Sequence, residues 1–137
     1  PGDFANDESP VIRKWRVIAG SDTPPSETAA WLPAYSKVDG TLPPADMPDG
    51  NAVFVRGYVN VQVAGSVRLQ LNATDGLELW IDGKQIEDPT SSLALSLGRR
   101  AFTFRIDRKA RPNDPGLRIE LKTPPGSQIK FQPEGGQ

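Results

Sequence analysis

The chain has 137 residues, of which 36% are hydrophobic, and this is enough to build one domain around a single core. Its 16 basic and 17 acidic residues leave a formal net charge of -1, which disfavours nucleic acid and anionic membrane surfaces as partners. Cysteine and histidine are both absent, which excludes disulfide bonds, catalytic triads and dyads that need an imidazole or a thiolate, and haem or zinc sites built from those groups.

Apolar and polar residues alternate over many short segments, which is typical of strands with one buried face. In residues 66–72, for example, Val67, Leu69 and Leu71 alternate with polar residues. No helical period continues over a dozen residues, and no apolar run is long enough for a spanning helix, so we expect no membrane insertion. In chain order, strands are predicted within residues 15–19, 52–63, 66–72, 77–86 as a hairpin, 92–97, 100–107, 117–122 and 127–131. The predicted fold class is all-β, an antiparallel β-sandwich of about eight strands, with residues 1–137 forming a single domain.

Residues 21–51 differ from the rest because they combine six prolines with small polar residues. A stretch of this length without structure of its own is uncommon in a compact domain and is often functional. We expect one long Pro-rich loop here, anchored across a sheet by its apolar residues. The candidate anchors are Trp31, Leu32, Tyr35, Leu42 and Met47.

Two smaller features also lead to predictions. Gly57 interrupts the longest predicted strand, so we expect a bulge or a bend at that position. The segment from Arg105 to Arg111 contains four cations within seven positions, which predicts a solvated turn.

The pair Asp82-Gly83 lies between two strand-like segments and predicts a two-residue hairpin loop of type I′, in which both residues adopt positive φ. Ile81 would then face Lys84 across the hairpin. Because side chains alternate along a strand, Trp80 points to the face opposite the aliphatic residues of its segment. There it would either cover a second sheet or form an exposed platform.

A candidate binding edge surrounds the two Asp-Gly pairs. Gly76 permits unusual backbone dihedrals, which places Asp75 at the rim of a sheet. Carboxylates can hydrogen-bond sugar hydroxyls or hold calcium, and an indole can stack on a sugar ring. The candidate ligand-binding residues are Asp75, Glu78, Trp80 and Asp82. The alternative is that both Asp-Gly pairs serve only the conformation of turns and that Trp80 serves packing.

The stretch LNATDGLELWIDGKQIED, residues 71–88, resembles the central motif of PA14-type domains, in which a strand leads through an aspartate-containing turn into a Trp-containing hairpin. WRV at 15–17 and GRRAFTFRIDR at 98–108 are similar to strands of related planctomycete modules. The resemblance covers about half of the chain and implies a PA14-like, jelly-roll-like sandwich.

In sugar-binding PA14 domains, an Asp-Asp pair holds a calcium ion that in turn binds the sugar. The matching positions here are Thr74 and Asp75. A threonine hydroxyl is a much weaker ligand for a hard cation than a carboxylate is. Only Asp75 is therefore carried over, and we expect no metal and no cofactor, with calcium disfavoured.

The segments YSKVDGTLPPADMP, 35–48, and PGSQIKFQPEGGQ, 125–137, resemble the C-terminal region of large planctomycete and verrucomicrobial proteins described as dehydrogenases or haem-binding proteins. This resemblance implies a domain from the C-terminal end of an exported multidomain bacterial protein, with an extracytoplasmic location, either periplasmic or secreted. The redox chemistry would belong to other domains, because this chain has no histidine or cysteine to ligate a haem.

We therefore expect a non-catalytic accessory module for recognition, with carbohydrate as the favoured ligand. The alternative is a structural or docking domain without a small ligand, which packs against neighbouring domains or protein partners through Trp31, Tyr35 and the long loop. An enzyme would need a pair of carboxylates at a defined separation in a cleft. The alternation scatters the acidic residues over the surface instead, so no catalytic residue is predicted.

Overall fold

The computed structural model describes residues 11–20, 22–111 and 115–134, and this part of the chain is all-β with antiparallel pairing. Its strands are β1 (Lys14–Ala19), β2 (Leu32–Tyr35), β3 (Ala52–Val63), β4 (Gly65–Leu71), β5 (Leu77–Ile81), β6 (Lys84–Ile86), β7 (Leu93–Leu95), β8 (Gly98–Asp107), β9 (Ile119–Lys122) and β10 (Lys130–Pro133). Its helical segments are two short 3-10 turns, η1 (Pro44–Asp46) and η2 (Arg108–Ala110). No helix among the described residues has the length and apolar character needed to cross a membrane.

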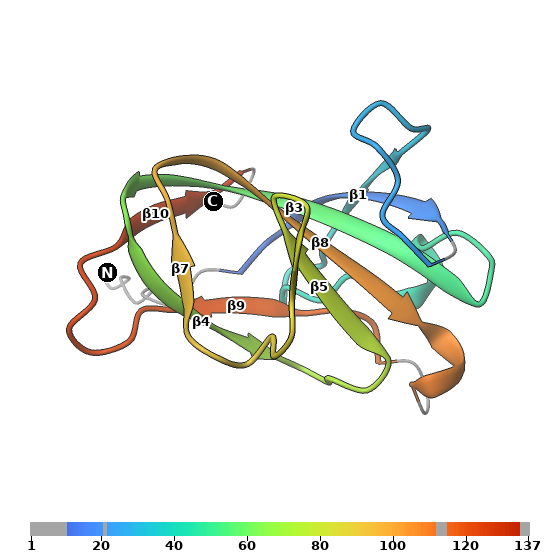
Figure 1. Cartoon of the computed structure of the whole chain (residues 1–137). Helices are drawn as coiled ribbons and strands as arrows, with labels where there is room; N and C mark the ends of the chain where they lie inside the picture. The colour runs from blue at the N-terminus through green and yellow to red at the C-terminus, as the bar shows by residue number, and fades with distance from the viewer. Residues whose placement is uncertain (1–10, 21, 112–114, 135–137) are drawn as a thin grey trace.

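Two sheets face each other and form a sandwich (Figure 1). The larger sheet has seven strands, six of them in the order β2-β1-β3-β8-β5-β6, and β10 joins it by pairing with β3. The smaller sheet has three strands in the order β7-β4-β9. β3 is central to the larger sheet, since β8 pairs with one of its edges while β1 and β10 share the other. The predicted all-β antiparallel sandwich is confirmed, with ten strands in the described residues rather than about eight.

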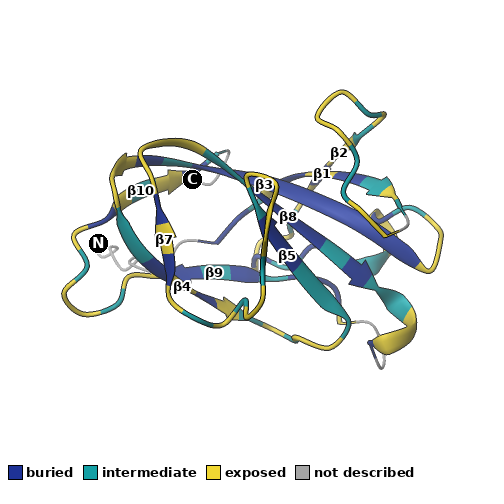
Figure 2. Ribbon diagram, viewed as in Figure 1, coloured by how far each residue is buried: buried dark blue, intermediate teal, exposed yellow. Residues whose placement is uncertain are grey.

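The core lies between the two sheets, and each sheet contributes every second residue of its strands to it. Phe102, Phe104 and Ile106 of β8 are fully buried, as the alternation predicts. From the smaller sheet, Leu69 and Leu121 belong to the same cluster. Figure 2 shows buried residues in the strands of both sheets, whereas exposed residues lie mainly in the connecting loops.

The predicted hairpin is confirmed. Asp82 and Gly83 have φ values of 52° and 86°, and Ile81 pairs with Lys84 across the turn. Positive φ at both loop residues is the geometry that matches the twist of the two flanking strands. This turn fixes the register between β5 and β6.

The prediction of a bulge or bend at Gly57 is wrong. β3 keeps a regular register with β8 through this position, where Gly57 pairs with Phe102. A Cβ atom on Gly57 would lie 2.7 Å from Cγ2 of Ile12 and 3.1 Å from the ring of Trp15. The glycine is therefore required by the close approach of two buried side chains and not by the shape of the backbone.

The long Pro-rich loop was predicted only in part. Residues 21–51 contain β2 and η1, so the stretch has structure of its own. Leu42 and Met47 are buried and act as anchors, and Leu42 also forms a bridge with Leu117. Leu32 and Tyr35 are exposed, at 59% and 61%. They therefore do not act as anchors, and Ala34 is the residue of β2 that is buried.

The basic segment from Arg105 to Arg111 is not wholly a solvated turn, because Arg111 is buried. Its guanidinium donates to the carbonyl oxygens of Ala73, Asp75 and Gly116, at 3.3, 2.9 and 2.6 Å. Carbonyl oxygens from two separate segments thus accept hydrogen bonds from its Nη1 and Nη2 atoms. Arg111 therefore holds together the turn before β5 and the segment before β9.

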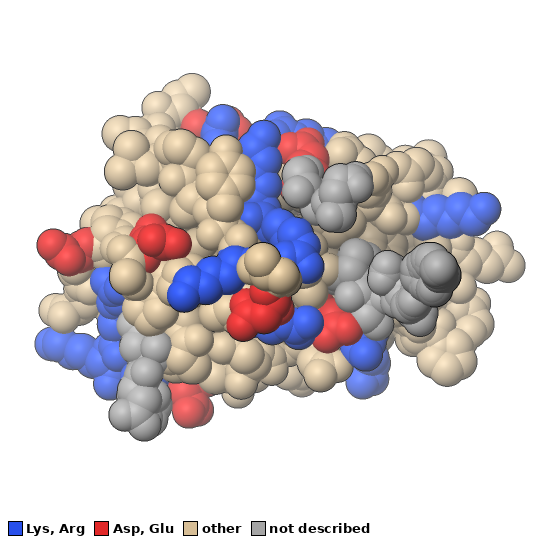
Figure 3. Space-filling model, turned by 180° about the vertical axis from the view of Figure 1, so that it is seen from behind, with Lys and Arg blue, Asp and Glu red and all other residues tan. Residues whose placement is uncertain are grey.

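Charged residues of both signs are mixed on the surface. On the side seen from behind, Lys and Arg side chains form a band across the middle, with Asp and Glu side chains next to it (Figure 3). This mixture agrees with the net charge of -1 and gives this side no broad field of one sign. The prediction of one domain over residues 1–137 includes residues 1–10 and 135–137, which lie outside the described part.

Candidate functional site

The four residues of the predicted binding edge do not meet at one place. Asp75 precedes β5 and Asp82 follows it, so the five-residue strand separates them by roughly 16 Å. The Asp75 side chain is exposed to solvent, and its backbone carbonyl accepts a bond from Arg111. The Asp82 carboxylate accepts a hydrogen bond from the backbone N–H of Ala101 at 2.9 Å and forms an ion pair with Arg100 at 3.1 Å. Asp82 therefore stabilises the hairpin against β8.

Trp80 and Glu78 share the face of β5 that points away from the smaller sheet, and they are held by neighbours there. Trp80 is only 9% exposed, with its ring 6.0 Å from that of Phe54. The indole therefore neither covers the second sheet nor offers an exposed platform, and the alternative prediction, that Trp80 serves packing, is confirmed. Glu78 forms an ion pair with Arg105 at 3.4 Å and accepts a bond from Gln85 at 3.3 Å.

Among the described residues, no group of three or more histidine, cysteine, aspartate or glutamate side chains could hold a metal ion. Asp75 therefore does not belong to such a group in this part of the chain.

A different group of residues meets on the outer face of the larger sheet, the face turned away from the smaller sheet. Phe54, Arg56 and Tyr58 alternate with the core residues of β3, yet all three are buried. Residues 22–31, the segment between β1 and β2, lie over Arg56 and Tyr58, and Trp80 packs beside Phe54. Alternation along β3 places these three side chains on one face of the strand but does not identify what covers them.

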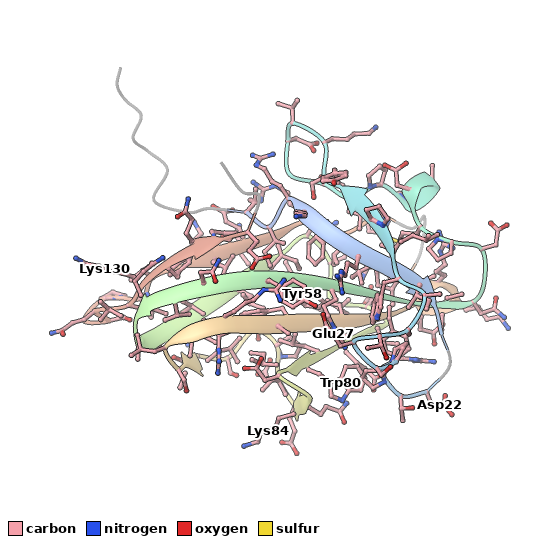
Figure 4. All side chains as sticks on the ribbon, turned by 90° about the horizontal axis from the view of Figure 1, so that it is seen from above. Asp22, Glu27, Tyr58, Trp80, Lys84 and Lys130 are labelled. Atoms are coloured by element: carbon pink, nitrogen blue, oxygen red, sulfur yellow. The ribbon has the colours of Figure 1, made fainter. Side chains whose placement is uncertain are left out.

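Glu27 connects this covering segment, residues 22–31, to the sheet. Its carboxylate accepts hydrogen bonds from the Tyr58 hydroxyl at 2.7 and 2.8 Å, and from Nη1 of Arg56 at 3.0 Å. Arg16 of β1 donates to the second carboxylate oxygen at 2.9 Å. Figure 4, seen from above, shows Glu27 next to Tyr58. Three residues from two neighbouring strands therefore fix one carboxylate over the sheet.

Arg56 links this network to the interior and to Trp31. Its Nε atom donates to Oγ1 of Thr103 at 2.7 Å, and Nη2 donates to the carbonyl oxygen of Pro25 at 3.3 Å. The centre of its guanidinium lies 4.6 Å from the centre of the Trp31 ring, within the range of a cation–π interaction. The indole N–H of Trp31 donates to the carbonyl oxygen of Ser26 at 2.8 Å. Trp31 is therefore held in a fixed orientation.

Arg99 and Glu134 form the other side of the site. The Arg99 guanidinium lies over the Tyr58 ring, 3.6 Å from its centroid, and donates two bonds to the Glu134 carboxylate at 2.6 and 3.1 Å. The backbone N–H of Glu134 donates to the carbonyl oxygen of Tyr58 at 2.9 Å. Bidentate pairing of this kind fixes both the position and the plane of an arginine.

These residues line a pocket of about 390 Å³, here called the outer-face pocket. Its lining includes three aromatic residues, Trp15, Trp31 and Tyr58, and charged side chains from β1, β3, β8 and the covering segment. Nearly all of its polar groups are held by partners within the chain, so the pocket is formed before any ligand arrives.

Hydrogen bonds, neighbouring charges and burial shift the pKa values of three groups in the pocket. The Tyr58 hydrogen bond, with Arg56 and Arg16 nearby, lowers the pKa of Glu27 below its ordinary value. The hydrogen bonds and charge of Arg99 lower the pKa of Glu134. Burial, with the neighbouring Glu27 carboxylate, raises the pKa of Tyr58. At neutral pH both carboxylates are therefore ionised and Tyr58 remains a hydrogen-bond donor.

A second hollow, of about 590 Å³, lies beside the β5–β6 hairpin and β7, and Asp82 is part of its lining. It contains serine, lysine and acidic side chains but no aromatic ring. Of the two, the outer-face pocket has the better defined chemistry, because aromatic and charged groups are fixed together there. No known protein-family model and no curated protein matches the sequence.

Proposed function

We propose that this chain is a non-catalytic recognition module that binds carbohydrate in the outer-face pocket. The observation that carries the proposal is the combination of the partly exposed Trp31 ring with fixed charged side chains in one open pocket, beside the buried Tyr58. Sugars present both an apolar face of C–H groups and a rim of hydroxyls, and such a pocket offers partners for both. The pocket thus takes the place of the edge formed by Asp75, Glu78, Trp80 and Asp82.

The protonation states favour binding over hydrolysis. A glycosidase needs one carboxylic acid with a raised pKa to protonate the leaving group, and a second carboxylate as base or nucleophile. In the outer-face pocket both Glu27 and Glu134 have a lowered pKa and are paired with arginines. Neither therefore has the properties of a general acid.

The setting of the module is proposed from the sequence resemblance alone. A PA14-like accessory domain at the C-terminal end of an exported multidomain bacterial protein would meet polysaccharides outside the cytoplasm. Separating a producing cell into cytoplasmic and extracytoplasmic fractions, and detecting the protein with an antibody, tests this location.

Calorimetric titration with a panel of soluble oligosaccharides tests the proposed binding. Trp31→Ala should abolish or weaken binding by roughly tenfold or more, because a fixed aromatic surface is lost. Tyr35→Ala is the matched control, since Tyr35 is also an aromatic residue of the stretch 21–51 but is exposed and outside the pocket lining. Absence of binding to every member of the panel, or equal binding by both variants, would refute the pocket as a sugar site.

A second function, docking to another protein or domain, is favoured by one specific observation. Leu32, Tyr35 and Val38 are exposed at 59%, 61% and 94%, and all three lie within seven residues at the β2 edge. Clustered exposed apolar side chains often mark an interaction surface. Pro33 has no N–H to donate, so contacts at this edge would come mainly from side chains rather than from an added strand.

Hydrogen exchange distinguishes this second function from the first. If residues 32–38 dock against a neighbouring domain or protein, their backbone amides should exchange more slowly when that partner is present than in the chain alone. The triple variant Leu32→Ala, Tyr35→Ala, Val38→Ala should remove that difference. Equal amide exchange rates with and without the partner would contradict docking at this edge.

A further inference from the structure

We propose that the ligand of the outer-face pocket is an acidic saccharide, which presents a carboxylate or a sulfate group to Lys14 and Arg16 of β1. This inference rests on the proposed function, because it names the class of sugar that the same pocket would select. It begins from an imbalance of charge that neither the composition nor the sequence pattern indicates.

The outer-face pocket is positively charged although the whole chain is not. Its lining contains four basic side chains, Lys14, Arg16, Arg56 and Arg99, and two acidic ones, Glu27 and Glu134. The excess of two positive charges contrasts with a net charge of -1 over the whole sequence. Both carboxylates are ionised at neutral pH, so this excess already includes their full negative charge.

The four basic residues differ in how many of their N–H donors are already bonded to acceptors within the chain. Arg56 donates through Nε, Nη1 and Nη2 to Thr103, Glu27 and Pro25, and it is buried. Arg99 donates two bonds to Glu134 and lies over the Tyr58 ring. These two arginines form the fixed wall of the pocket.

Lys14 and Arg16 retain donors for a ligand. They lie two positions apart on β1, so both side chains project from its outer face. Among the described residues, Arg16 donates one hydrogen bond, from Nη1 to Glu27. Its side chain is 44% exposed. Lys14 is exposed and its ammonium group has three N–H donors. Together they offer a cationic site at the mouth of the pocket.

The aromatic residues place the sugar ring close to these cations. Trp31 belongs to the covering segment and Tyr58 to β3. β1, which carries the two cations, lies between β2 and β3 in the sheet. All of these side chains line the same pocket of about 390 Å³. A sugar ring held there can therefore extend an acidic substituent toward β1, where a charge-assisted hydrogen bond is stronger than one between neutral groups.

The experiment compares one saccharide in charged and neutral forms. Tetragalacturonate and its fully methyl-esterified form have the same sugar backbone, and a sulfated galactan tetrasaccharide separates sulfate from carboxylate as the anionic group. Each is titrated into the intact chain by calorimetry at two salt concentrations. We expect an anionic form to bind at least roughly tenfold more tightly than the ester, and this preference to weaken at high salt.

Matched variants locate the anion. Lys14→Gln and Arg16→Gln should each remove most of the preference for the charged form over the ester. Lys130→Gln is the control, because it also removes one positive charge but lies toward the other end of the sheet from Glu27 (Figure 4). A fall in affinity of equal size in Lys14→Gln and Lys130→Gln would overturn the assigned site.

The outcomes separate this inference from the proposed function. Equal binding of the charged and esterified saccharides would overturn the inference and leave carbohydrate recognition intact. Binding of none of the three would overturn the inference, and the wider panel of oligosaccharides then decides whether carbohydrate recognition fails as well. Preference for the uronate or for the sulfated form would support the inference and identify which anionic group the pocket selects.

Discussion

Phe104 shows how a single residue anchors the inner face of the larger sheet. It is fully buried on the inner face of β8, and its ring meets that of Trp15 edge-on, with centroids 6.2 Å apart. Phe104→Ala should therefore lower the free energy of unfolding by about 3–5 kcal/mol, because a large buried side chain leaves a cavity.

Urea denaturation of the Phe104 variant measures this loss. Tyr35→Ala is a useful control, because it removes an aromatic ring that is 61% exposed and should change stability by less than about 0.5 kcal/mol. A similar midpoint for the two variants would mean that β8 has another register.

The Glu27 carboxylate contributes to the free energy of unfolding in a way that depends on pH. Its pKa in the folded protein lies below its ordinary value of 4.5, chiefly because the Tyr58 hydroxyl donates to the ionised form. A lowered folded pKa stabilises the protein above the unfolded value, and the stabilisation is lost as the pH falls through the folded value. Glu27→Gln should therefore cost up to about 1 kcal/mol at pH 7, since the side chain is half exposed, and less as the pH falls toward 3.

Urea midpoints of the parent and of Glu27→Gln at pH 7 and pH 3 test this dependence. Glu87→Gln controls for the loss of one negative charge, because Glu87 is exposed and lies beyond β6, away from the pocket. If the difference between Glu27→Gln and the parent stays the same at both pH values, the Glu27 carboxylate does not provide the stabilisation.

At the scale of single residues, alternation identified the core but not the pocket. The period of two along β8 is a local property, so Phe102, Phe104 and Ile106 could be assigned to the core directly. The contact between Glu27 and Tyr58 joins residues 31 positions apart. Charged side chains have many acceptable partners, so no local pattern identifies this one. The same limit explains Trp80, since alternation predicts its face but not the presence of Phe54 beside it.

At the scale of the elements, the stability of the β5–β6 hairpin depends on the conformation of its turn. Gly83 has φ of 86°, and a Cβ atom at this position would have no neighbour within 4 Å. The cost of Gly83→Val is therefore one of backbone conformation alone, about 1–2 kcal/mol, because a β-branched residue resists positive φ. Gly83→Asn should cost less, since asparagine adopts this region more readily.

Thermal unfolding of the two Gly83 variants tests the role of the turn. The expected order of midpoints is parent, then Gly83→Asn, then Gly83→Val. A valine variant as stable as the parent would show that the turn tolerates another conformation, and the register of Ile81 with Lys84 would then need another explanation.

The edge strand β2 illustrates which elements a sequence pattern fails to predict. It has four residues, one of them Pro33, and lies within a proline-rich stretch that otherwise predicts a loop. Its existence depends on pairing with β1, where Trp15 lies opposite Ala34. A short edge strand is specified mainly by its partner, so its own sequence carries little signal.

At the scale of the whole molecule, the two sheets share one core. Val67 and Leu69 of β4, with Ile119 and Leu121 of β9, belong to the same cluster of buried residues as the inner faces of β3, β5 and β8. A smaller sheet of three short strands has no separate core of its own among the described residues. We therefore expect both sheets to unfold in one cooperative transition.

Leu121→Ala tests this cooperativity, because it changes only the smaller sheet. The side chain is fully buried, so its truncation should cost about 2–5 kcal/mol. All three tryptophans of the chain lie in the larger sheet or in the segment that covers it. If the sheets unfold together, tryptophan fluorescence and far-ultraviolet circular dichroism shift to the same lower urea midpoint. If the fluorescence midpoint stays at the parent value while the dichroism midpoint falls, the smaller sheet unfolds alone and the single shared core is not the unit of stability.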